Sequence, residues 1–142
     1  MTALSPQPKG IPAPNPSVRS APYWAQARRG TLTYQRCSNC GFVSLRTFAV
    51  CARCLSADYD RLASRGKGSL YSWTVVWRAP DPAFSVPYAP AVVELDEGYF
   101  MVSAVVGCEV EDLRPGMRLK VVFHEASDEI TLPYFAPDGE LP

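Results

Sequence analysis

Short runs of apolar and polar residues alternate through the second half of the chain, and they predict strands rather than helices. Glu97-Gly98 supplies a hairpin turn between two of these runs. Five short strands in sequence favour a small, partly open Greek-key barrel of the OB type, which we place at residues 67–136. The five runs, rich in β-branched and aromatic residues, are 69–77, 91–96, 99–106, 118–124 and 130–135.

One long connection interrupts the predicted barrel after its first strand. Residues 78–90, RAPDPAFSVPYAP, show no strand pattern. A loop of this length in a small barrel is more often functional than accidental. After the last strand, the polar residues 137–142 form a tail.

The first part of the chain is polar and proline-rich. Residues 1–18 contain few large apolar side chains. Such a segment cannot bury enough surface to offset its ordering entropy, so we expect an arm that is extended or disordered when alone.

Residues 20–30, SAPYWAQARRG, predict a helix of about two turns. Ser20 is a suitable N-cap and Gly30 a suitable terminator. A helix this short is marginal by itself in water, so Tyr23 and Trp24 need a surface to pack against. That surface is either the module that follows in this chain or another subunit, since interfaces are enriched in Trp and Tyr.

Four of the five cysteines form two Cys-x-x-Cys pairs separated by ten residues: Cys37 with Cys40, and Cys51 with Cys54. Two tight turns that each present two thiolates can close a tetrahedral zinc site. Gly41 directly follows the first pair, where such a turn often needs positive φ. The apolar residues between the pairs predict a short hairpin: Phe42, Val43, Leu45, Phe48 and Val50.

This pattern predicts a helix plus zinc ribbon at residues 19–66, with a glycine-rich junction to the barrel at residues 64–68. Leu32 to Arg36 reads as the strand that feeds the first turn. Residues 55–62 show no clear period and are expected to lead out of the ribbon.

Other chemistries also use cysteines. A disulfide framework fits poorly with five cysteines, an odd number, and a redox pair needs only one Cys-x-x-Cys that opens a helix. A rubredoxin-type iron site or an iron–sulfur cluster remains open, because the same four thiolates can hold it. Four protein ligands leave no coordination position for catalysis, which favours a structural metal.

Composition narrows the classes of function. The 142 residues carry 14 basic and 14 acidic side chains, whereas nucleic-acid binding usually needs a basic surface. No apolar run approaches the length that spans a membrane. With no apparent targeting segment, we expect a cytoplasmic protein that binds neither nucleic acid nor membrane.

Catalytic groups are sparse. His124 lies in a predicted strand, and Cys108 sits among valines, where a buried inert thiol is expected. Glu94, Asp96 and Glu97 cluster at a hairpin, which is typical of a solvated turn. None of these residues forms a convincing acid/base or nucleophile/base pair.

The ordered pattern resembles the zinc-ribbon and OB-fold proteins associated with acyl-CoA enzymes. The resemblance covers roughly residues 20–136. Its motifs are PYWAQARRG, TLTYQRCSNCG leading into CARC, GKGSLYSWTVVWRAPDPAF, VPYAPAVVELDEG, MVSAVVGCEVEDLRPGMRLKVVF and TLPYF.

The resemblance implies a noncatalytic accessory subunit. Relatives form complexes, such as heterotetramers, with thiolase-superfamily proteins that include thiolases and steroid side-chain retro-aldolases. Others pair with, or are fused to, enoyl-CoA hydratases. In these complexes the partner carries the reacting groups. The ribbon and barrel then stabilise the partner and help accommodate an acyl-CoA thioester as a shared ligand, beside a structural zinc.

Within that picture, five side chains are candidates for contact with CoA or the partner. Cations can pair with CoA phosphates, and aromatic rings can stack on adenine or cover the pantetheine arm. Alternatively, the aromatic residues fill the barrel core or meet the partner. The candidates are Arg65, Lys67, Arg78, Phe84 and Tyr88.

Two other classes of function remain as alternatives. A single-stranded nucleic-acid-binding module would use the OB face and the ribbon, and it predicts salt-dependent oligonucleotide binding. A free-standing CoA-thioester enzyme predicts turnover without a partner.

Overall fold

The computed structural model describes residues 2–45 and 49–139. It confirms a mainly β fold with one helix, a cysteine-rich ribbon and a five-stranded barrel. The elements are β1 (Ala3–Leu4), α1 (Ala21–Arg28), β2 (Thr33–Cys37), β3 (Val43–Ser44), β4 (Tyr59–Ala63), β5 (Lys67–Trp73), β6 (Ala89–Leu95), β7 (Phe100–Val105), β8 (Cys108–Glu109), the 3₁₀ turn η1 (Val110–Asp112), β9 (Arg118–Glu125) and β10 (Thr131–Pro137).

The barrel is closed in the strand order β10-β7-β6-β5-β9. Four of its five joints are antiparallel; the fifth, between β7 and β10, is parallel and rests on the single pair Val105 and Phe135. The expectation of a partly open barrel therefore needs correction, although this joint is the weakest. Alternate residues point inward and form the core: Leu70, Val93, Leu95, Met101, Leu119 and Phe135.

The first barrel strand is shorter than the sequence pattern predicted. It ends at Trp73 after a register shift between Leu70 and Ser72, and beyond it Val76 and Tyr88 form one isolated bridge. Residues 74–77 have strand-forming side chains but lack a continuous partner strand.

The ribbon is a three-stranded sheet with β2 at its centre, between β3 and β4. Strand β4 pairs with β2 over five residues, although residues 55–62 were expected to lead out without regular structure. The reason is that β4 is an edge strand with no fully buried residue, so no apolar alternation marks it. Phe48, expected on the ribbon's apolar face, lies outside the described residues.

Ribbon and barrel share one core. Tyr34 of β2 stacks on Tyr99 beside β7, with ring centroids 5.1 Å apart and planes at 20°. Glu97, in the β6–β7 turn, accepts hydrogen bonds from Ser64 Oγ at 2.6 Å and from the Arg65 backbone N–H at 3.1 Å. Glu97 therefore holds the junction between ribbon and barrel through one side-chain donor and one backbone donor.

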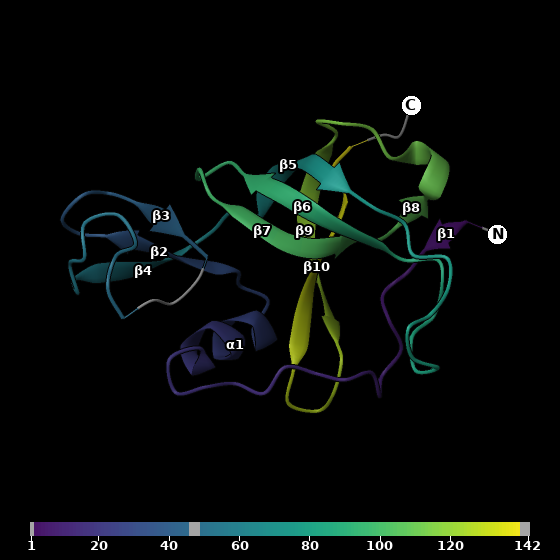
Figure 1. The fold of residues 1–142 in the computed structure, drawn as a ribbon, viewed down its shortest axis with the longest axis horizontal. Helices are drawn as coiled ribbons and strands as arrows, with labels where there is room; N and C mark the ends of the chain where they lie inside the picture. The colour runs from purple at the N-terminus through teal and green to yellow at the C-terminus, as the bar shows by residue number, and fades with distance from the viewer. Residues whose placement is uncertain (1, 46–48, 140–142) are drawn as a thin grey trace.

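The N-terminal arm lies along the barrel. Strand β1 pairs with β8, and Leu4 is buried in the barrel core. Residues 12–19 are exposed. Disorder of residues 1–18 was expected for the arm alone, and that stays a prediction. Figure 1 shows the ribbon beside the barrel, with α1 below them and next to the β9–β10 hairpin.

Candidate functional site

The four predicted metal ligands come together at one end of the ribbon. Their sulfur atoms all lie within 4.8 Å of one another. Cys37 Sγ lies 3.6 Å from Cys54 Sγ, and Cys40 Sγ lies 3.6 Å from Cys51 Sγ. A tetrahedron with metal–sulfur bonds of about 2.3 Å has sulfur–sulfur edges of about 3.8 Å. The arrangement therefore fits a four-thiolate metal site.

Both cysteine turns are built by the same backbone hydrogen bonds. Gly41 N–H donates to Cys37 O, and Leu55 N–H donates to Cys51 O, each at 3.0 Å. The two donors occupy equivalent positions and both have positive φ, 77° for Gly41 and 65° for Leu55. The sequence indicated the special role of Gly41 but gave no sign that Leu55 adopts the same conformation.

Hydrogen bonds favour the thiolate form at Cys51 and Cys54 by lowering their pKa, whereas burial and the neighbouring thiols raise the pKa of Cys40 to about 11. Asn39 Nδ2 donates to Cys54 Sγ at 3.4 Å, which lowers the pKa of Cys54 to about 6. The Arg53 backbone N–H donates to Cys51 Sγ at 3.3 Å. Because only the thiolate binds a metal strongly, these donors suit the chemistry that the spacing predicts.

The five candidate CoA contacts fall into two groups at opposite ends of β5. Arg65 and Lys67 lie where β5 begins, and Lys67 Nζ already pairs with Asp138 at 2.8 Å. Arg78, Phe84 and Tyr88 lie in the long loop beyond the other end of β5. The structure therefore does not bring the five side chains together at one place.

The long loop, predicted at residues 78–90, ends at residue 88 because β6 begins at Ala89. It is ordered by contacts with itself and with the N-terminal arm. The rings of Phe84 and Tyr88 stack with centroids 5.9 Å apart. Gln7 is buried, and its amide binds the Ser85 backbone twice: Nε2 donates to Ser85 O at 3.0 Å, and Oε1 accepts from Ser85 N–H at 2.8 Å. Sequence reasoning missed Gln7, because a glutamine in a proline-rich arm looks like a solvated residue.

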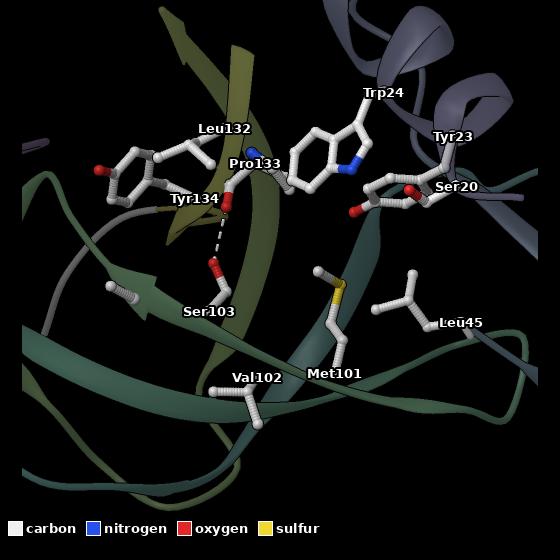
Figure 2. Close-up of a pocket in the computed structure, with 11 residues that line it drawn as sticks. Ser20, Tyr23, Trp24, Leu45, Met101, Val102, Ser103, Leu132, Pro133 and Tyr134 are labelled. Atoms are coloured by element: carbon white, nitrogen blue, oxygen red, sulfur yellow. Dashed lines mark hydrogen bonds between the residues drawn. The ribbon is translucent and has the colours of Figure 1, made fainter. Parts of the chain in front are cut away.

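A groove of about 590 Å³ lies between α1, the ribbon and the barrel. We call it the α1 groove. Figure 2 shows Tyr23, Trp24 and Leu45 toward one end and Tyr134 at the other. The sequence predicted only that Tyr23 and Trp24 need a packing surface. The lining residues are Ser20, Tyr23, Trp24, Leu45, Met101, Val102, Ser103, Ala104, Leu132, Pro133 and Tyr134.

The side chains considered for catalysis take part in packing or in hydrogen bonds that join elements of the fold. Burial raises the pKa of the Cys108 thiol to about 11, and His124 packs edge-on against the ring of Tyr134. Arg118 donates two hydrogen bonds to Asp96, at 2.9 and 2.6 Å, which lower the pKa of that carboxyl. Asp96 and Glu97 thus do more than form a solvated turn, because both hold elements together.

Fold and cysteine cluster define a zinc-ribbon/OB-fold protein, and comparison with known proteins identifies the family. Residues 24–60 match the family model described as ChsH2, rubredoxin-like zinc ribbon domain. Residues 62–124 match ChsH2, C-terminal OB-fold domain. A DUF35 domain-containing scaffold protein of Methanocaldococcus jannaschii is 33% identical, over 66% of this chain and 68% of that protein. The chain belongs to the DUF35 family, as the resemblance in sequence indicated.

A longer relative is the probable enoyl-CoA hydratase alpha subunit of Thermomonospora curvata. It is 35% identical over 92% of this chain, but the chain spans only 41% of its length.

Solved structures agree with the fold. A chain of the Ltp2-ChsH2(DUF35) aldolase superposes with a TM-score of 0.80 at 34% identity, covering 88% of this chain and 98% of that one. A DUF35 protein of unknown function from Sulfolobus solfataricus has a TM-score of 0.62 at 11% identity, which supports the fold alone. Across the described residues, no helix is long and apolar enough to cross a membrane.

Proposed function

We propose that this protein is a noncatalytic accessory subunit of a thiolase-fold acyl-CoA enzyme complex, of the thiolase or steroid side-chain retro-aldolase type. The observation that carries the proposal is the likeness to the Ltp2-ChsH2(DUF35) aldolase chain over nearly its whole length. The names of the DUF35 scaffold relatives support the same role. The expected assembly is a cytoplasmic heterotetramer, to which an enoyl-CoA hydratase can be added by analogy with the longer relative.

The metal in this proposal is one structural zinc ion. Cys37, Cys40, Cys51 and Cys54 would hold it, and the family model for residues 24–60 is a zinc ribbon. A zinc ion with four thiolate ligands supplies cross-linking and no open coordination position. Its role is to hold the two cysteine turns together and so keep the ribbon folded.

The long loop is our proposed contact for the polar part of CoA. Arg78 is exposed and its cation suits a phosphate, while the Phe84 and Tyr88 rings offer stacking faces. Arg65 and Lys67 lie at the far end of β5, so we assign them to the partner or to a separate part of the ligand.

Co-expression tests the proposal. The chain is produced with a thiolase-fold protein encoded beside it, and separately with a thiolase encoded elsewhere in the same genome as a control. A stable stoichiometric complex with the first protein alone is expected, with turnover of acyl-CoA confined to the complex. A chain that never co-purifies with its neighbour, or that turns over acyl-CoA by itself, would contradict the proposal.

The nucleic-acid alternative has a separate measurement. The zero net charge predicts no binding of single-stranded oligonucleotides at low salt. Salt-dependent binding there would favour the alternative.

A further inference from the structure

The α1 groove lies where the barrel is least closed. Strands β7 and β10 pair only at Val105 and Phe135, so the two strands diverge away from this pair. Ser103 Oγ spans the gap and donates to Pro133 O at 2.8 Å. Helix α1 covers the opening with Tyr23 and Trp24, whose rings meet edge to face at 5.0 Å. The result is a preformed cavity rather than an unfinished core.

The described wall of this cavity is mainly apolar and carries few polar side-chain groups. The hydroxyls of Ser20, Ser103 and Tyr134 are all engaged in hydrogen bonds. The Tyr23 hydroxyl has no hydrogen-bond partner among the described residues, and Figure 2 shows it directed into the cavity. Burial raises the pKa of Tyr23 to about 12, so the group remains a donor at neutral pH. Tyr23 is half-buried, so its hydroxyl is open to water or to a ligand in the groove.

We propose that the α1 groove binds the acyl group of a neutral ester or thioester, whose carbonyl oxygen accepts a hydrogen bond from Tyr23. The chain of that acyl group would lie against Trp24 and Met101. This assignment rests on the proposed function for the source of the ligand, an acyl-CoA, and it places the acyl end on this subunit.

Size and charge both select this class of ligand. The volume of about 590 Å³ lies within the range of small-molecule sites. Among the described residues, no charged side chain lines the groove. A free carboxylate would therefore lose its hydration without a compensating cation from these residues, whereas a carbonyl oxygen can be satisfied by a hydroxyl donor such as that of Tyr23.

The groove also connects with the proposed CoA-binding loop. The Tyr134 hydroxyl at its far end accepts from the Gln7 backbone N–H at 3.2 Å, and the Gln7 side chain binds Ser85 in the loop. With the carbonyl at Tyr23 and the acyl chain against Trp24 and Met101, the pantetheine arm would run along the groove toward Tyr134 and the loop.

A matched pair of ligands tests the inference on the full-length, zinc-loaded chain. Octanoyl-N-acetylcysteamine carries the thioester carbonyl, and S-octyl-N-acetylcysteamine has the same chain without it. Titration followed by NMR or calorimetry should show the thioester binding about fivefold more tightly, the ratio expected for one net hydrogen bond. Tyr23→Phe should reduce this ratio to about one while the thioether binds as before.

Tyr71→Phe is the matched control, because Tyr71 is exposed on β5 and does not line the groove. It should leave the ratio unchanged. Equal affinities for the two ligands, a ratio that survives Tyr23→Phe, tighter binding of octanoate, or no saturable binding would each overturn the inference.

Different experimental results would contradict the groove assignment and the proposed function. Tyr23-dependent thioester binding by a chain that never co-purifies with a thiolase-fold partner would leave the groove assignment intact and remove the complex. A stable complex whose subunit shows no difference between the two ligands would do the reverse.

Discussion

At the scale of single residues, Leu55 is the most informative position in the ribbon. It is 73% exposed, yet it adopts the left-handed conformation that its counterpart Gly41 adopts in the other cysteine turn. A β-carbon at such a φ costs about 1 kcal/mol or more. Because the leucine side chain recovers little of this by burial, the folded ribbon retains local strain.

We expect Leu55→Gly to stabilise the zinc-loaded protein by about 0.5–1 kcal/mol. Relief of strain favours the folded state, and the greater freedom of glycine in the unfolded chain offsets part of it. Denaturant unfolding measures the difference.

Gly41→Ala is the reciprocal variant. A β-carbon at Gly41 would meet no atom within 4 Å, so its cost is backbone strain alone, and a loss of about 1 kcal/mol is expected. A Leu55→Gly variant less stable than the natural chain would contradict the strain argument.

At the scale of elements, the ribbon depends on its metal because its own core is small. Strands β2, β3 and β4 contribute few fully buried side chains, while four cysteines close the sheet at one end. Structural zinc in small peptides has an apparent binding free energy of about 10–16 kcal/mol. Such a term outweighs the packing that a three-stranded sheet can supply.

Cys40→Ser should therefore remove zinc and unfold the ribbon. Elemental analysis should fall from one zinc per chain toward zero, and amide exchange should accelerate in β2 and β4. Cys108→Ala removes the fifth cysteine, outside the cluster, and should retain full zinc. Sub-stoichiometric metal in the fresh natural protein, or iron in place of zinc, would refute the zinc assignment.

The N-terminal arm is the element that orders the long loop. We expect Gln7→Ala to free residues 84–88, because it removes both side-chain hydrogen bonds to Ser85, each worth about 0.5–1.5 kcal/mol. Faster amide exchange in that segment is the measurement.

Lys9→Ala is the control for the arm, since its ion pair with Glu125 is largely exposed and should matter little. If Gln7→Ala and Lys9→Ala give the same exchange in residues 84–88, the arm does not restrain the loop.

At the scale of the whole molecule, elements with a local signal could be predicted and contacts between distant segments could not. The barrel strands alternate in sequence because one face of each is buried, and the cysteine spacing defines its own site. Edge strand β4 carries no such alternation. The α1 groove and the Gln7–Ser85 pair each join segments far apart in the chain, so no local pattern marks them.

The same distant contacts decide whether ribbon and barrel behave as one body. Tyr34 and Tyr99 stack across the boundary, and Glu97 bonds the junction at Ser64 and Arg65. Stacked aromatic pairs contribute about 0.5–1.5 kcal/mol beyond the area they bury. An accessory subunit that presents a groove and a loop to a partner needs this rigidity, because α1 contacts both β2 and β10.

A double-mutant cycle with Tyr34→Leu and Tyr99→Leu measures this coupling. We expect a coupling free energy of about 1 kcal/mol and a single unfolding transition in zinc-saturated buffer. If the two losses simply add, and the ribbon melts before the barrel, the modules are independent. The α1 groove would then change shape whenever the ribbon moves, and the ligand contrast at Tyr23 would weaken in the Tyr34→Leu variant, which leaves the groove lining untouched.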